Sequence, residues 1–166
     1  MLLKRNDVNP DTPDTSCRTP LLWASKQGDE GIVRMLLERN HVNPDKPDMS
    51  GRTPLLWASK HGHEGIVRML LERDDVSPDK PISWGRTPLS RASRSGEEGV
   101  VRMLLQRDDV NPNQRDFLSR TPRFQASLHG NDGVARMLLE RNGADSLKSD
   151  WLCRTLLRLT SRGQQP

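Results

Sequence analysis

The sequence has few apolar residues, few cysteines and no long hydrophobic run. Hydrophobic residues make up 33% of its 166 residues. Even with the 12 glycines added, this fraction stays below the roughly 45–50% that is typical of globular domains. A single thick core is therefore not expected. No apolar stretch approaches the roughly 20 residues needed to cross a bilayer, and residues 1–7 are too short and too charged for a secretory signal. We expect an intracellular protein, cytoplasmic or nuclear, without membrane contact.

Cysteine and charge give weaker constraints. Two cysteines are too few for a disulfide framework or a four-cysteine zinc site, and they suit a reducing compartment. Lys and Arg number 26 against 22 Asp and Glu, a net charge of +4 with a pI near 9.5. This balance favours anionic partners only if the basic residues cluster.

A period of 34 residues runs through the whole chain. The tripeptide Arg-Thr-Pro begins at positions 18, 52, 86 and 120, and Arg-Thr-Leu begins at position 154. The tetrapeptide Arg-Met-Leu-Leu recurs at positions 34, 68, 102 and 136. Self-similarity at a fixed period indicates a repeat architecture, in which each unit buries its apolar face against its neighbours.

Each unit predicts two helices and a long loop. Thr53 can cap a helix that has Pro54 as its first residue, and Gly62 can end it. A second helix is expected from about residue 64 to 73, with a helical apolar stripe. We expect the leucines of this stripe, Leu36, Leu70, Leu104 and Leu138, to be buried between units. Residues 74–81 contain two prolines and no apolar periodicity, so we expect an exposed loop.

These residues resemble the ankyrin-repeat family. One unit matches the family pattern at Asp48, Gly51, Thr53, Pro54, Leu55, Ala58, Gly62, His63, Val67, Leu70, Leu71 and Val76. The resemblance implies an all-α ankyrin-repeat solenoid of stacked helix-turn-helix units with protruding β-turn fingers. The chain departs from the family pattern where the family has a histidine, and the usual hydrogen bonds of that histidine are therefore not expected. The residues at these positions are Leu22, Leu56, Ser90 and Phe124.

The period divides the chain into four full units and two partial ones. The full repeats span 14–47, 48–81, 82–115 and 116–149. Residues 1–13 correspond to a second helix alone, and residues 150–166 to a partial C-terminal repeat and tail. Because repeat arrays usually carry polar capping units, we expect the chain to be a piece of a longer protein.

Candidate chemical groups fit structural roles better than catalytic ones. His61, His63 and Glu64 approach the helical zinc motif, but Val67 stands where that motif needs histidine. The serines that recur after alanine, at positions 25, 59, 93 and 127, have no His–Asp pair at a fixed spacing. We expect no enzyme activity, no metal and no cofactor. Cys17 and Cys153 lie four units apart, so we expect no disulfide between them.

Two ladders of arginine accompany the repeats. Arg34, Arg68, Arg102 and Arg136 each follow an acidic residue by four positions. We expect i, i+4 pairs on a solvated outer face. The second ladder lies in the turns, and we expect no acidic residue at a fixed spacing from it. Its members are Arg18, Arg52, Arg86, Arg120 and Arg154. Together with Lys26, Lys60 and Arg94, this ladder predicts a positive concave face.

The family resemblance implies that partners bind the concave face, through finger tips and first helices. The tips vary while the frame is constant, and they become more apolar toward the C-terminus. Candidate partner-binding residues are Met49, Arg52, Trp84, Arg86, Arg94, Phe117, Leu118, Arg120 and Trp151. Binding and finger-to-finger packing are both open for the aromatic tips. Packing between first helices is favoured for Trp23 and Trp57.

We therefore expect a monomeric, non-catalytic scaffold that binds a protein partner. One alternative is a recognition or autoinhibitory arm of a larger signalling or enzymatic protein. Another is electrostatic binding of an acidic or phosphate-bearing partner, among which nucleic acid is the less favoured choice.

Overall fold

Eight helices and their connecting loops make up the described part of the chain. The computed structural model describes residues 9–39 and 41–142, and these ranges contain no β-strand. The helices are α1 (Pro20–Gln27), α2 (Glu30–Leu37), α3 (Pro54–Lys60), α4 (Glu64–Leu71), α5 (Pro88–Ser95), α6 (Glu98–Leu105), α7 (Pro122–Leu128) and α8 (Asp132–Asn142). The predicted all-α class is confirmed.

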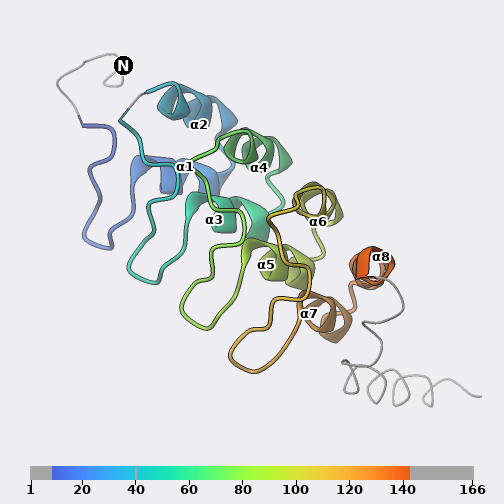
Figure 1. The fold of residues 1–166 in the computed structure, drawn as a ribbon. Coiled ribbons are helices and arrows are strands. Elements are labelled where there is room, and N and C mark those ends of the chain that lie inside the picture. Colours follow the sequence, from blue (N-terminus) through green and yellow to red (C-terminus); the bar gives the residue numbers. More distant parts are fainter. Residues whose placement is uncertain (1–8, 40, 143–166) are drawn as a thin grey trace, which may run out of the picture.

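The helices form two rows (Figure 1). The inner helices α1, α3, α5 and α7 pack on one another in sequence, and the outer helices α2, α4, α6 and α8 form the second row. Each inner helix also packs against the outer helix that follows it. Long loops project from the inner row, away from the outer helices (Figure 1). We call these loops, at residues 9–19, 41–53, 72–87 and 106–121, the fingers.

The inner helices begin as the sequence predicts. Thr53 is the N-cap of α3, its hydroxyl accepts a hydrogen bond from the Leu56 N–H at 3.3 Å, and Pro54 is the first helical residue. The other three inner helices have the same threonine cap. In α5, Ser90 adds a bond of its own, because its hydroxyl accepts from the Thr87 N–H at 3.0 Å. One residue at a replaced family histidine therefore closes a local capping box.

The core lies between the two rows of helices. Leu36, Leu70, Leu104 and Leu138 are fully buried, which confirms the prediction for the apolar stripe. The predicted exposed loop at residues 74–81 is exposed at positions 74, 75, 77 and 81, but not throughout. Val76 and Pro78 are buried in it, and Val76 belongs to the hydrophobic core. A single valine per loop has no periodicity, so the pattern gave no signal of its burial.

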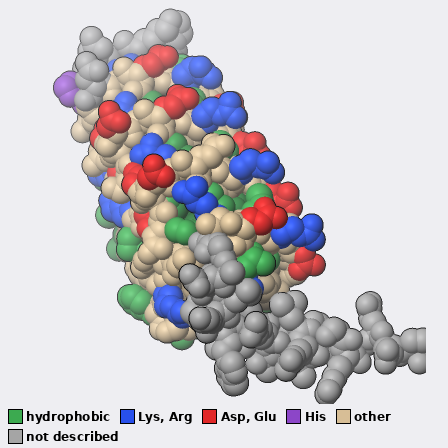
Figure 2. All heavy atoms as spheres, turned by 45° about the vertical axis from the view of Figure 1, so that its right-hand side comes forward, with side chains coloured by type: hydrophobic (Ala, Val, Ile, Leu, Met, Phe, Trp, Pro, Cys, Tyr) green, Lys and Arg blue, Asp and Glu red, His purple; other side chains and the backbone are tan. Residues whose placement is uncertain are grey.

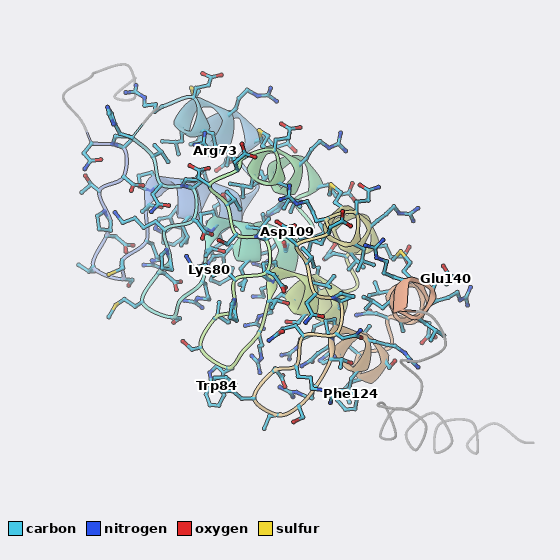
Figure 3. The ribbon with its side chains drawn as sticks, in the orientation of Figure 1. Arg73, Lys80, Trp84, Asp109, Phe124 and Glu140 are labelled. Carbon is cyan, nitrogen blue, oxygen red and sulfur yellow. The ribbon has the colours of Figure 1, made fainter. Side chains whose placement is uncertain are left out.

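The outer helix α4 ends at Leu71 rather than at Arg73. Outside the helix, the Arg73 guanidinium has three bonds: Nε and Nη2 donate to the Asp75 carboxylate, each at 2.8 Å, and Nη1 donates to the Leu37 carbonyl at 3.2 Å. Arg107 repeats this arrangement one unit later with Asp109 and the Leu71 carbonyl. Figure 3 labels Arg73 and Asp109. A cation at the carbonyl end of the preceding outer helix complements its dipole and ties adjacent units together.

Within residues 9–39 and 41–142, every helix is too short and too polar to span a membrane.

Candidate functional site

Each finger but one is held by an aspartate and the arginine four residues later, a pair that we call the finger clasp. In the second unit the Asp48 Oδ1 accepts from the N–H groups of Ser50 and Arg52, at 2.9 and 3.0 Å. Its Oδ2 accepts from the Arg52 Nε at 2.7 Å. The same clasp joins Asp14 to Arg18 at 2.9 Å and Asp116 to Arg120 at 2.7 Å.

The clasp corrects the prediction that the turn ladder has no acidic companion. Asp14, Asp48 and Asp116 each precede a ladder arginine by four residues, so the signal was present in the sequence. It was missed because the ladder was compared as a whole, and the third unit has Ile82 at this position. The ladder residues Arg18, Arg52 and Arg120 are therefore paired within the chain and are not free cations.

The clasp hydrogen bonds lower the pKa of the carboxyl groups. Mainly through the Arg18 N–H, the pKa of Asp14 falls to about 2. For Asp116, burial raises the pKa, but the Arg120 side chain and N–H and the Leu118 N–H outweigh it, and the net shift is downward. Hydrogen bonding to the ionised form causes this direction.

In the first and fourth units, a residue nine positions after the clasp aspartate donates to the same carboxylate from the inner helix, whereas the buried Nε1 of Trp57 at this position of the second unit has no partner in the described ranges. The Trp23 Nε1 donates to the Asp14 Oδ2 at 3.2 Å, and the Gln125 Nε2 donates to the Asp116 Oδ2 at 3.1 Å. In the second unit this residue is Trp57. The Arg52 guanidinium lies over its ring at 4.6 Å from the centroid.

The two inner-helix tryptophans pack between cations, as favoured from the sequence. Trp57 is buried and Trp23 is half-buried. The Lys26 ammonium lies 4.8 Å from the Trp23 ring centroid and 4.9 Å from that of Trp57, and Lys60 also lies 4.9 Å from Trp57. These cation–π contacts keep both indoles in the inner row.

The third unit lacks the clasp. Ile82 replaces the aspartate and is 8% exposed, and the residue nine positions later is Arg91. The Nε atoms of Arg86 and Arg91 are buried, and neither has a hydrogen-bond partner in the described ranges. Sequence reasoning named Arg86 but missed Arg91, which the register of Trp23, Trp57 and Gln125 would have identified.

The third finger also turns differently. In the clasped fingers, the second residue after the aspartate donates its N–H to the Oδ1. Trp84 has no such acceptor, and its φ is 90°. The Gly85 N–H still donates to the Ile82 carbonyl at 2.9 Å. A positive φ at the third residue of a turn is the type II geometry that usually needs glycine, so Trp84 stores backbone strain.

The finger tips expose large apolar side chains. Met49 is 74% exposed, Trp84 62%, Phe117 76% and Leu118 64%. Figure 3 shows Trp84 at the end of its loop, directed away from the helices. Neighbouring tips are joined through their backbones, since the Phe117 N–H donates to the Trp84 carbonyl at 3.0 Å. Finger-to-finger packing thus leaves most of these side chains uncovered.

The remaining site candidates divide into exposed and undescribed residues. Arg94 is exposed on α5, and its backbone carbonyl accepts a hydrogen bond from the Asn131 Nδ2 at 2.9 Å. Trp151, Cys153 and Arg154 lie outside the described residues, as do residues 1–8.

The outer face differs from its prediction in one respect. Arg34, Arg68, Arg102 and Arg136 are all exposed, and Figure 2 shows acidic and basic side chains interspersed on the face that it presents. The expected i, i+4 ion pairs are not formed in the described ranges. The Glu64 carboxylate instead lies against Gly99, near the start of α6. The N-terminal end of a helix attracts negative charge, which accounts for this position.

The histidine and serine candidates have packing contacts. His61 stacks on Trp57 with centroids 5.7 Å apart, and the His63 Nε2 lies 3.2 Å from the Lys26 carbonyl. No group of three or more His, Cys, Asp or Glu residues in the described ranges could hold a metal ion. The hydroxyls of Ser25, Ser59 and Ser93 are buried between helices without a partner among the described residues. Cys17 is exposed with a free thiol.

Comparison with known families gives one match. A family model described as ankyrin repeats (3 copies) matches residues 1–80 and 74–150. No curated protein matches the chain.

Proposed function

The chain belongs to the ankyrin-repeat family, and on that basis we propose that it binds a protein partner through its fingers and inner helices. Members of this family are generally protein–protein interaction modules. The proposed contact residues are Met49, Arg52, Trp84, Arg86, Arg94, Phe117, Leu118, Arg120 and, outside the described residues, Trp151. The exposed thiol of Cys17 suits a reducing, intracellular compartment.

One observation carries the proposal: four large apolar side chains are exposed at three successive finger tips. Trp and Phe are enriched among the residues that dominate binding energy, and clustered exposed apolar groups mark interaction surfaces. A polar residue would satisfy the turn equally well at each tip. The outer face carries interspersed charges, and its large exposed apolar side chains, Ile32 and Met35 on α2, are less exposed than those of the finger tips, at 40% and 48%.

The charge distribution favours a protein partner over nucleic acid. Of the four described arginines in the turn ladder, Arg18, Arg52 and Arg120 are paired with clasp aspartates. Such pairing removes the continuous positive track that would follow a phosphate backbone. The arginines retain a role in orienting polar groups of a partner.

Site-specific photo-crosslinking tests this function. A benzoylphenylalanine residue placed at position 117 or 118 should cross-link a discrete protein in a lysate of the cells that express the chain, because these positions lie on the finger tips. Mass spectrometry of the adduct identifies the partner. Positions 68 and 102 are matched controls, since Arg68 and Arg102 are exposed on outer helices and line the two shallow grooves between them.

Cross-linking from the finger positions with little from the outer ones is the expected result. Cross-linking from positions 68 and 102 alone would place the partner on the outer helices. An absence of adducts from all four positions would contradict the protein-binding function itself.

A further inference from the structure

The third unit lacks a carboxylate that its neighbours hold. In the first and fourth units, one aspartate receives the arginine four residues later and an inner-helix side chain nine residues later. In the third unit both of these side chains are arginines, Arg86 and Arg91, and Ile82 replaces the acceptor. Two cations thus converge where the frame of the repeat places an anion.

Neither arginine finds a substitute acceptor for its Nε within the described chain. The Nε atoms of Arg86 and Arg91 are buried and unpartnered, while both side chains remain partly exposed. Buried polar groups in folded proteins are mostly hydrogen-bonded, so an unpartnered one points to a partner such as water, an ion or a ligand. The Trp57 Nε1, at the register of Arg91, is unpartnered as well, but Arg86 and Arg91 differ in carrying charge. Because both residues are only partly buried, part of each side chain beyond the buried Nε is accessible to a ligand.

The surroundings strengthen the positive field. Burial lowers the pKa of Arg91, and the charges of Arg86, Arg94 and Arg52 lower it further. The pKa of Lys60 is also lowered, by burial first and then by Arg91 and other nearby cations. Arg52, one of these cations, is paired with Asp48. Asp116, whose backbone lies next to Gly85, is paired with Arg120. An incoming anion would relieve this repulsion.

We propose that Arg86 and Arg91 form a receptor site for the side-chain carboxylate of an aspartate or glutamate in the protein partner. This inference rests on the proposed protein-binding function, which it makes specific. The partner's acidic residue would pair with Arg86 as Asp14, Asp48 and Asp116 pair with the ladder arginines within the chain. Trp84, two residues before Arg86, places an exposed apolar surface on the same finger.

A carboxylate fits better than a phosphate because the fold itself supplies the precedent. The clasps of the neighbouring units use the same arginine position, and each holds a planar carboxylate at 2.7–2.9 Å. A guanidinium binds such a group through paired N–H donors. Phosphate binding is a distinct outcome that the following experiment detects.

The test uses the full chain, labelled with ¹⁵N, and a hexa-aspartate peptide as the probe. NMR signals of the arginine Nε–H groups report on the environment of the Arg86 and Arg91 guanidinium groups. Both signals should shift saturably with hexa-aspartate, and a hexa-asparagine peptide should leave them unchanged. The Arg68 and Arg102 signals on the outer helices serve as internal controls.

Two substitutions at one position sharpen the test. Ile82→Asp should fill the site with an internal carboxylate and weaken hexa-aspartate binding at least about tenfold, the loss expected when a charge-assisted hydrogen bond is pre-empted. Ile82→Asn removes the same isoleucine without adding charge and should retain binding. Arg91→Gln should weaken binding in the original background.

Three results would overturn the inference. The first is shifts at Arg86 and Arg91 no larger than those at Arg68 and Arg102. The second is equal binding by the Ile82→Asp and Ile82→Asn variants. The third is tighter binding of inorganic phosphate than of hexa-aspartate at equal ionic strength, which would make this a phosphate site. Any of these can occur while position 117 still cross-links a partner, so the inference can fail without the proposed function.

Discussion

Asp48 and Arg52 form an ion pair with 2.7 Å between Oδ2 and Nε, whereas Ile82 and Arg86, at the same two positions one unit later, cannot form one. The clasp therefore serves as an internal reference for the third finger. It identifies which bonds are missing there, and it explains why Trp84 has a positive φ while Ser50, its counterpart, is held by the Asp48 carboxylate.

The first prediction concerns stability when the clasp is restored. Ile82→Asp should give a higher free energy of unfolding than Ile82→Asn, by about 1–3 kcal/mol at pH 7. The reason is that a hydrogen bond between a carboxylate and a charged donor is stronger than one between a neutral amide and the same donor. Both variants lose the same buried isoleucine, so the comparison isolates the charge. Urea unfolding measures the difference. Equal stability of the two variants would show that Arg86 does not turn toward position 82.

A second prediction concerns acid. The pKa of Asp116 is lowered in the folded chain, so its contribution is present above the unfolded pKa of about 3.9 and is lost as the pH falls through the lower folded value. Asp116→Asn should cost about 1–2 kcal/mol at pH 7 and progressively less below pH 4. Urea unfolding at pH 7, 5 and 3 tests this.

The control for Asp116 is an acid outside the clasps. Asp29→Asn removes an exposed carboxylate that makes no side-chain capping bond, and its effect should be small at every pH. A cost for Asp116→Asn that stays constant down to pH 3 would mean that its charge does not contribute.

The third prediction uses a missing cation. Lys46 and Lys80 bind the aspartates of the preceding unit, Asp11 and Asp45, at 3.3 and 2.8 Å. Gln114 takes this place opposite Asp79. Burial raises the pKa of Asp79, and the negative charge of Asp109 raises it further, while the hydrogen bond from the Asn111 N–H lowers it by less.

Gln114→Lys should lower the pKa of Asp79 and stabilise the fold by about 0.5–1 kcal/mol at pH 7. In the original chain, the pKa of Asp79 is raised in the folded state, so protonation of Asp79 favours folding. Its unfavourable effect on the free energy of unfolding therefore decreases as the pH falls through that raised pKa. Carboxyl ¹³C titration and urea unfolding measure both effects. The gain should vanish in an Asp79→Asn background, and a gain that persists there would rule out the pairing.

Much of the frame could be predicted from the period and from local rules. Thr53 and Pro54 specify where α3 begins, and Leu70 specifies the buried face of α4, because these features depend on neighbours within a few residues. The clasp between Asp48 and Arg52 was equally readable and was missed because Ile82 breaks the series.

Other features depend on contacts between units, which periodicity does not encode. Arg73 reaches the Leu37 carbonyl, 36 residues away. The burial of Val76 likewise arises from packing on the core. The positive φ of Trp84 accompanies the absence of a carboxylate at position 82 that could accept the Trp84 N–H. The sequence did not predict it, because tryptophan is not a residue that usually adopts a positive φ.

The fourth prediction tests the coupling between units. Leu70→Ala should cost about 2–5 kcal/mol, because Leu70 is fully buried between the rows. In a solenoid the coupling is between nearest neighbours, so the loss should split unfolding into separate transitions of the two halves. Calorimetry shows this directly. Leu128→Ala, at a half-exposed leucine, is the control, and one unchanged transition for Leu70→Ala would contradict the nearest-neighbour account.

The most direct test of the central claim measures how tightly four variants bind the partner identified by cross-linking. The variants, each first confirmed to be folded, are Trp84→Ala, Phe117→Ala, Arg68→Ala and Arg102→Ala. Truncating a hot-spot aromatic costs at least about 2 kcal/mol, or roughly thirtyfold in Kd. An exposed outer-face arginine should cost almost nothing. The account predicts this loss for the two finger variants and little change for the other two. Loss of binding in the outer-face variants, with full affinity in both finger variants, would contradict it.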